Sequence, residues 1–109
     1  MKNTLSLKVD NEKIYLELDG KKKSVPAARK QSEKLLKAIV DFCDLKKVKA
    51  ISINNTGSSF TALRIGVTSA NALAYGLGIE IIPTENKNIF KVNNKKYAAP
   101  VYDREPNIG

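Results

Sequence analysis

The sequence predicts one α/β domain with the element order β-β-β-α-β-α-β, and three features of the chain lead to this prediction. Near its start, apolar residues alternate with polar ones over 5–9 and 14–18, as in half-buried strands. Two later segments, 26–43 and 59–77, repeat apolar residues at helical spacing. A short apolar run follows each of these two segments. At 109 residues the chain can bury one modest core.

The first three elements are expected to be antiparallel strands joined by tight turns. Asp10-Asn11-Glu12-Lys13 separates the two alternating segments, and Asp19-Gly20 is a typical hairpin turn. A third strand should then cover 21–25. Its consecutive lysines would protect the edge of the sheet from aggregation.

The first helix is predicted over 26–43, because Pro26 suits a first helical turn. The strand that follows, 48–53, is more continuously apolar, which is typical of a strand covered on both faces. The apolar stripe of this helix is expected to contain Leu35, Leu36, Ile39, Val40 and Cys43.

The second helix, 59–77, follows a polar turn and carries small residues at regular spacing. Gly66, Ala70 and Ala74 lie four apart, so they share one face of the helix. A ridge with almost no side chain would let another backbone approach closely. We therefore expect this face to be a groove for an incoming helix.

The last part of the chain contains several stop signals. Gly76 and Gly78 are expected to end the second helix. A fifth strand should cover 79–82 and stop at Pro83. Beyond it, an Asn93-Asn94 turn predicts a small extra hairpin.

The net charge of +8 is unevenly distributed. Residues 1–49 hold 13 basic and 7 acidic groups, whereas residues 50–86 hold one basic group, Arg64. Either the lysines only solvate the surface, or a basic face meets RNA or an acidic partner. The aromatic residues are scattered and form no RNA-binding signature. Arg64 either lies along its helix with its head in water or bridges a carboxylate on a neighbouring helix or a partner.

The composition argues against catalysis. The chain has no histidine, so Ser59 and Thr61 have no obvious base, and no metal-ligand spacing occurs. Cys43 is the single cysteine, expected in buried packing, and its isolation fits a reducing cytoplasm. No apolar run reaches membrane-spanning length, and no signal peptide is expected. We predict no catalytic residue, cofactor or metal.

The turn 54–58 allows two interpretations. A turn of this kind before a helix can bind phosphate through its backbone N–H groups. No lysine stands at the helix start to meet a phosphate, so this is not a P-loop. The other interpretation is a hydrogen-bonded turn that caps the helix through Ser58 or Ser59.

Three stretches carry a resemblance to a known family. Residues 59–66, S-F-T-A-L-R-I-G, resemble the S-F-T-G-L-R-I-G signature of the TsaB (YeaZ) family. Residues 72–79 resemble its A-x-G-L-A-Y-G-L-x-I run, and 32–36 its H-S-E-x-L-L helix, with Gln31 in place of the histidine. The match covers about residues 30–83.

The resemblance implies a fold and a domain division. The predicted order is that of the ribonuclease H-like (actin/sugar kinase, ASKHA) half-domain, of which TsaB-like proteins contain two. This chain has room for one. Residues 1–83 would be a TsaB-like N-terminal α/β half-domain, and 84–109 a C-terminal hairpin and tail. Residues 100–106 resemble the P-V-Y-x-R-x-P tail of some family members.

The resemblance also implies a function. TsaB-like proteins are non-catalytic partners of the catalytic subunit TsaD in tRNA threonylcarbamoyladenosine (t6A) modification, and they pair helices with it. We therefore expect a heterodimer with a TsaD-like subunit, with a homodimer as the alternative, and contact with tRNA only through the complex. Nucleotide binding is not expected, because the second phosphate loop would lie in the missing half. The interface is predicted to contain Leu36, Ile39, Val40, Cys43, Leu63, Arg64, Gly66, Val67, Ala70 and Ala74.

The alternative hypothesis is a small basic RNA-associated module without catalytic activity, suggested by the +8 charge. A residual enzyme, either an ATPase or a peptidase, is a third possibility. The absence of histidine and of a second lobe argues against it.

Overall fold

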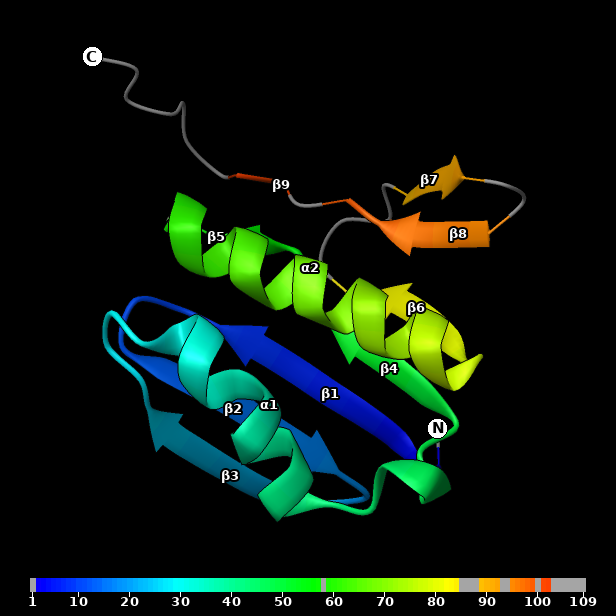
Figure 1. Cartoon of the computed structure of the whole chain (residues 1–109), viewed down its shortest axis with the longest axis horizontal. Coiled ribbons are helices and arrows are strands. Elements are labelled where there is room, and N and C mark those ends of the chain that lie inside the picture. The colour runs from blue at the N-terminus through cyan, green and yellow to red at the C-terminus, as the bar shows by residue number, and fades with distance from the viewer. Residues whose placement is uncertain (1, 58, 85–88, 93–94, 100, 103–109) are drawn as a thin grey trace.

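The computed structural model describes residues 2–57, 59–84, 89–92, 95–99 and 101–102 (Figure 1). Ser58, the Asn93-Asn94 turn, Pro100 and the tail from 103 onward lie outside the described residues. The strands are β1 Thr4–Val9, β2 Lys13–Leu18, β3 Lys21–Pro26, β4 Ala50–Ile53, β5 Thr56–Gly57, β6 Glu80–Pro83, β7 Ile89–Val92, β8 Lys95–Ala98 and β9 Val101–Tyr102. The helices are α1 Gln31–Phe42, the short 3₁₀ helix η1 Leu45–Lys47, and α2 Phe60–Leu77.

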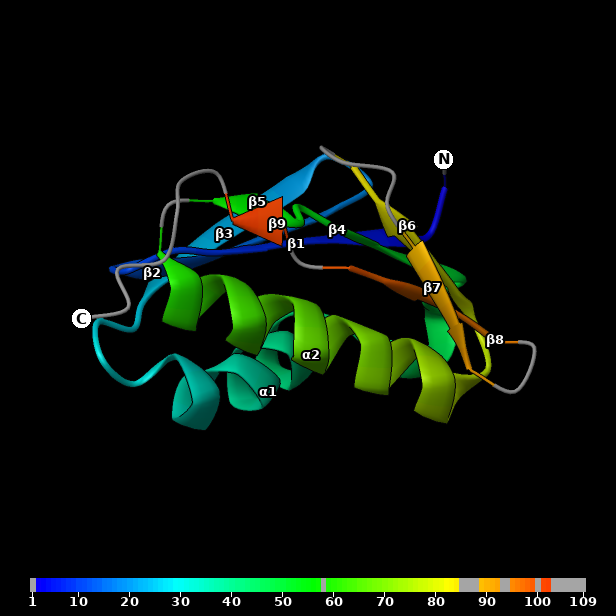
Figure 2. The same ribbon diagram turned by 90° about the horizontal axis from the view of Figure 1, so that it is seen from above.

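The predicted mixed sheet of five strands is confirmed. Its order is β3-β2-β1-β4-β6, in which β2 is antiparallel to both β1 and β3, and β4 is parallel to both β1 and β6. Figure 2 shows α1 and α2 side by side on the same face of this sheet. Helix α1 packs on β2, whereas α2 packs on β1, β4 and β6.

Helix α1 begins at Gln31, five positions later than predicted. Pro26 remains the last residue of β3, where it pairs with Lys13. The next backbone N–H, that of Ala27, donates to the Glu12 carbonyl at 2.8 Å. Proline lacks an N–H, so it suits the end of an edge strand as well as a helix start. Here its long-range pairing with Lys13 places it in the strand.

Helix α2 has a well-defined start and end. The Ser59 hydroxyl accepts a hydrogen bond from the Ala62 N–H at 3.3 Å, so this serine is the N-cap. Gly78 ends the helix with a φ of 67°, in the left-handed region that favours glycine. Gly76 lies inside the helix and does not end it.

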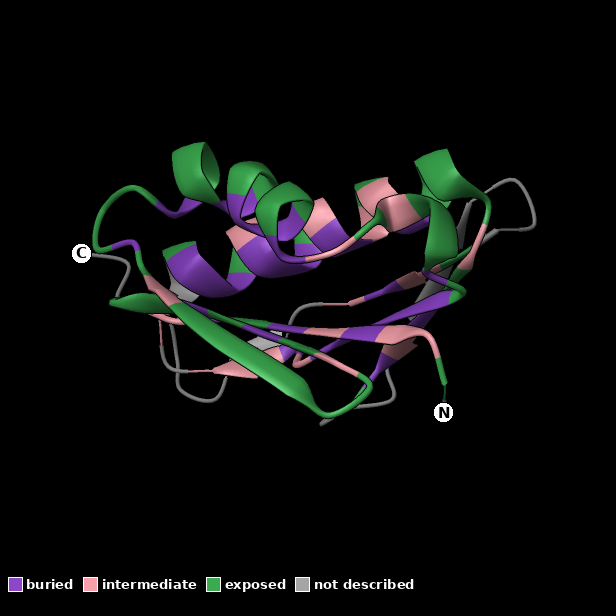
Figure 3. Cartoon of the chain, turned by 90° about the horizontal axis from the view of Figure 1, so that it is seen from below, coloured by how far each residue is buried: buried purple, intermediate pink, exposed green. Residues whose placement is uncertain are grey.

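The core lies between the sheet and the two helices, where Figure 3 shows the buried residues facing one another. Alternate residues of β1 and β2 point toward the helices and are buried, whereas those between them, such as Tyr15, lie on the other face. Among the described residues no helix covers that other face. Strand β4 is nevertheless buried along its length, because its outward residues Ala50 and Ser52 are small and flanked by β1 and β6. The Ser52 hydroxyl donates to Ser6 on this open face at 3.0 Å.

The segment after β6 packs along the flank of α2 that lies away from α1 (Figure 1). The Asn71 side chain accepts from the Ala98 N–H at 2.8 Å and donates to the Ala98 carbonyl at 2.9 Å. The fully buried Asn55 donates to the Ala99 carbonyl at 2.8 Å. We call Asn55 and Asn71 the asparagine clamp, because together they hold residues 98 and 99 through main-chain atoms alone.

Candidate functional site

Helix α1 has two distinct flanks beside its buried stripe. The Lys34 ammonium donates to the Pro26 carbonyl of β3 at 3.3 Å, so this flank faces the outer edge of the sheet. Asp41 lies on the same flank, seven positions further on. Leu36 and Val40 lie on the opposite flank, toward α2, and their exposed fractions are 56% and 55%. Two large apolar side chains one turn apart are therefore left in solvent beside α2.

The buried stripe of α1 differs from the predicted one. It contains Leu35, Ala38, Ile39 and Phe42 together with Gln31. The Gln31 amide donates to the carbonyls of Asp10 and Asn11, which ties the start of the helix to the β1–β2 turn. Leu36 and Val40 were expected in the stripe but lie outside it, because the stripe that contacts one sheet is narrower than the apolar arc of this helix.

Helix α2 exposes a second row of small residues. Thr68, Ala72 and Gly76 are four apart and all exposed, and a Cβ placed on Gly76 would meet nothing within 4 Å. The row that contains Ala72 lies opposite the buried row of Gly66, Ala70 and Ala74, on the side of α2 that the sheet does not cover. We define the helix-pair face as Leu36 and Val40 of α1 with Thr68, Ala72 and Gly76 of α2.

The predicted ridge on α2 faces the sheet and offers no groove. A Cβ on Gly66 would lie 3.1 Å from Val9 Cγ2 and 3.7 Å from Ile53 Cδ1. Ala70 and Ala74 are also buried in the chain's own core. Placing these three residues on an exposed groove was therefore wrong. The small side chains let α2 approach β1 and β4 closely within the chain itself.

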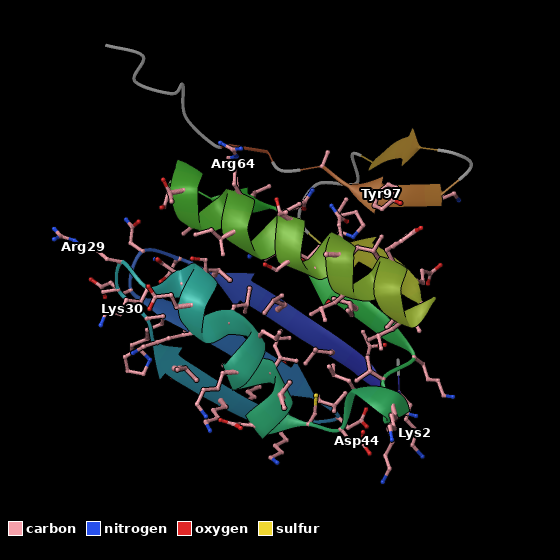
Figure 4. The ribbon with its side chains drawn as sticks, in the orientation of Figure 1. Lys2, Arg29, Lys30, Asp44, Arg64 and Tyr97 are labelled. Carbon is pink, nitrogen blue, oxygen red and sulfur yellow. The ribbon has the colours of Figure 1, made fainter. Side chains whose placement is uncertain are left out.

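The remaining predicted interface residues divide in the same way. Ile39, Leu63 and Val67 are buried in the core between the helices and the sheet. Arg64 is exposed on α2, and Figure 4 shows it pointing away from α1. Cys43 is half-buried at the end of α1, where burial and then the charge of Asp44 raise the pKa of its thiol, against a smaller lowering by Lys21. Of the ten residues, only Leu36, Val40 and Arg64 are exposed.

The ends of β1 and β4 form the second candidate site, a polar pocket of ≈ 570 Å³ at the start of α2. Asp10 lies in it, with its carboxylate accepting the N–H groups of Glu12 at 2.9 Å and Lys13 at 2.8 Å. Burial raises the pKa of Asp10, but these bonds, Tyr15 and Lys8 favour the ionised form, so the net pKa is lowered. Asn54 accepts from the Thr56 N–H, and Ser59 caps α2. These polar groups are engaged in the pocket's own turns, which favours the capping interpretation of the 54–58 turn.

Among the described residues, no group of three or more acidic, histidine or cysteine side chains could hold a metal ion. No helix in this part of the chain is both long and apolar enough to cross a membrane.

No family model and no curated protein matches the chain. The solved structure of YeaZ from Pseudomonas aeruginosa is similar, with a TM-score of 0.65 and 24% identity over 77% of this chain and 44% of that one. A second structure, described as an uncharacterized protein with similarity to peptidase YeaZ from Pseudomonas aeruginosa, gives a TM-score of 0.64 at 24% identity, over 77% of this chain and 43% of that one. The chain thus spans less than half the length of these neighbours. The likeness shows a small α/β domain with a YeaZ-like fold.

Proposed function

We propose that this chain is a non-catalytic, TsaB-like partner subunit that docks through its helix-pair face on a TsaD-like subunit and supports t6A modification of tRNA. In this proposal the domain is one half of an ASKHA architecture. The single observation that carries the proposal is the exposed helix pair. Leu36 and Val40 of α1 and a row of small residues on α2 are all exposed, on the side of the helices that the sheet does not cover.

The chemistry of this face suits a helix-to-helix contact. Apolar side chains more than half exposed are stabilised by burial, at about 25 cal/mol per Å² of apolar surface. Thr68, Ala72 and Gly76 would admit a helix at close range, because little side chain stands between the backbones. A specific interface covers about 1,200–2,000 Å² in total, so a partner would also contact residues around this face.

The resemblance supports the choice of partner. One of its two eight-residue matching stretches, residues 59–66, opens α2, one of the two helices that form the face. The pocket at the ends of β1 and β4 supports the non-catalytic part of the proposal, since Asp10 and Ser59 serve their own turns. A calorimetric titration with MgATP is expected to give no binding heat.

The experiment is co-purification of the tagged chain with the TsaD-like subunit of the same cell, followed by light scattering to determine the mass of the complex. The wild type should form a one-to-one complex. Val40→Arg should abolish it, because a long cation would replace an apolar contact at the centre of the face. Asp41→Arg is the matched control, because it places the same side chain on the other flank of α1.

Two outcomes would contradict the proposal. One is the absence of a wild-type complex, and the other is equal binding by the two arginine variants. Light scattering of the chain alone at tens of micromolar tests self-association through the same face, which Val40→Arg should also abolish. Ala70→Arg cannot serve here, because Ala70 is fully buried and the variant would disrupt the core.

A further inference from the structure

The positive charge of the chain is concentrated on one edge of the fold. Residues 21–41 contain seven basic and two acidic groups, so they carry +5 of the total of +8. Six of these cations come from β3, α1 and the loop that joins them, and we call them the basic edge: Lys21, Lys23, Arg29, Lys30, Lys34 and Lys37. All six residues are exposed.

The contacts of the described side chains show that two rows of cations converge here. Lys21 and Lys23 pair with Leu18 and Leu16, so they project on the helix side of the sheet. The Lys21 ammonium lies 5.2 Å from the centre of the Phe42 ring of α1. From the other side, Lys34 reaches the Pro26 carbonyl. The lysines of β3 and α1 therefore lie on the same edge of the fold.

Few of these charges are neutralised within the domain. Lys37 forms an ion pair with Asp41 at 3.0 Å, in which the two side chains are 79% and 53% exposed. Pairs as exposed as this contribute little, about 0–1 kcal/mol. The remaining acidic group of the segment, Glu33, makes no ion pair in the described part of the chain. The edge therefore keeps a strong positive field.

We propose that the basic edge binds the phosphate backbone of a double-stranded nucleic acid. The 12 residues of α1 extend over about 18 Å. One strand of a duplex presents a phosphate about every 3.4 Å along its axis, so about five phosphates fall within that length. The five or six cations of the basic edge match this number.

The character of the edge distinguishes a duplex from other acidic partners. Protein interfaces have an apolar centre, but Phe42 is buried, and Leu36 and Val40 lie on the other flank of α1. Single strands bind by stacking bases on exposed aromatic rings, and none of the six residues is aromatic. A surface of lysines without apolar or aromatic anchors suits contact with phosphates alone. This inference does not depend on the proposed partner subunit.

The experiment measures fluorescence anisotropy of a labelled RNA duplex of about 20 base pairs, titrated with the full chain at several salt concentrations. Binding should weaken with salt, with a slope of log K against log salt of about −4 to −5, since each phosphate contact contributes about −0.9. The variant Lys23→Gln/Arg29→Gln/Lys30→Gln should make this slope shallower by about 3 and weaken binding at least about tenfold at low salt. The three side chains have no partner among the described contacts, so the fold should persist, which circular dichroism checks.

The matched control removes the same charge at the other end of the molecule. Lys46→Gln/Lys47→Gln/Lys49→Gln neutralises the basic group beside Asp44, which Figure 4 shows far from Arg29 and Lys30. This control should change the affinity less than about twofold. Equal weakening by both triple variants, or equal binding of polyglutamate and the duplex, would overturn the proposal. A DNA duplex of the same length separates contact with phosphates alone, which gives equal affinity, from contact that also uses the RNA 2′-hydroxyls, which favours RNA.

Discussion

The contact between Gly66 and β1 makes a quantitative prediction about the stability of the domain. A Cβ added at Gly66 would lie 3.1 Å from Val9 Cγ2 and 3.2 Å from Val9 Cβ, closer than normal van der Waals contact. Gly76, in the same helix, has open space at the corresponding position. The same substitution, glycine to alanine, should therefore have opposite effects at the two sites.

The magnitudes follow from two competing terms. Alanine gains about 0.5–1 kcal/mol over glycine in a helix, because glycine loses more backbone entropy on folding. At Gly66 this gain is opposed by overpacking against Val9, which costs about 1–3 kcal/mol. Gly76→Ala receives the gain alone, reduced because Leu77 is the last helical residue. We expect Gly66→Ala to be about 1–3 kcal/mol less stable than Gly76→Ala.

Urea unfolding of the wild type and both variants, followed by circular dichroism, measures this difference. A difference of 1 kcal/mol shifts the melting temperature of a domain of this size by about 4–8 °C, so thermal unfolding gives a second reading. In the background of Val9→Ala the cost of Gly66→Ala should become smaller, because the Cγ2 methyl group at 3.1 Å is gone while Cβ at 3.2 Å remains. Equal stabilisation at both glycines would refute the conclusion that Gly66 sets the distance between α2 and β1.

Three further predictions concern the clamp, the β1–β2 turn and the thiol. Asn71→Ala should destabilise the domain by about 1–3 kcal/mol and speed hydrogen exchange at the Ala98 amide, since it leaves that buried N–H and C=O unpaired; unchanged exchange would contradict this. The lowered pKa of Asp10 stabilises the fold above the ordinary carboxyl pKa, and this stability should be lost as pH falls through the folded-state pKa. The urea midpoint should therefore drop less between neutral pH and pH about 3 for Asp10→Asn than for the wild type. The reason is that the amide oxygen accepts the same N–H bonds without a charge that can be lost. Because burial raises the pKa of the Cys43 thiol, iodoacetamide should modify it severalfold more slowly in the folded chain than in urea, and equal rates would show that the thiol is accessible.

The sheet was predictable because its signals are local. Alternating apolar residues in β1 and β2 fix which face points inward, and the Asp19-Gly20 turn fixes how the second and third strands pair. The helix pair on one face follows from two crossovers between parallel strands. Ser59 as the cap and Gly78 as the end of α2 also depend on residues within the turn itself.

The face of α2 that meets the sheet was not predictable from spacing. Small residues occur four apart in two rows, one with Gly66 and the other with Gly76, and periodicity alone cannot distinguish them. Packing against Val9 and Ile53 selects the first row. Likewise, Pro26 suits a strand end and a helix start equally well, and only its pairing with the distant Lys13 assigns it to the strand.

The contacts that position the last strands were missed for a related reason. Asn55 and Asn71 appear in the sequence as ordinary polar residues of a turn and a helix. Their partners, residues 99 and 98 respectively, are 44 and 27 positions away. The signal that could have identified Asn71 is a polar residue near the apolar arc of a helix, where an amide requires a hydrogen-bonding partner.

The asparagine clamp also determines where this domain can change during evolution. The Asn71 side chain bonds only to main-chain atoms of residue 98, so the identity of most neighbouring side chains does not affect its two hydrogen bonds. Only the size of residue 98 is restricted, because Ala98 is fully buried. The connection between β6 and β8 can therefore gain or lose residues while the strand beyond it keeps its alignment on α2. Insertions, tags or reporter peptides placed in that connection should leave the five-stranded sheet and the helix pair intact.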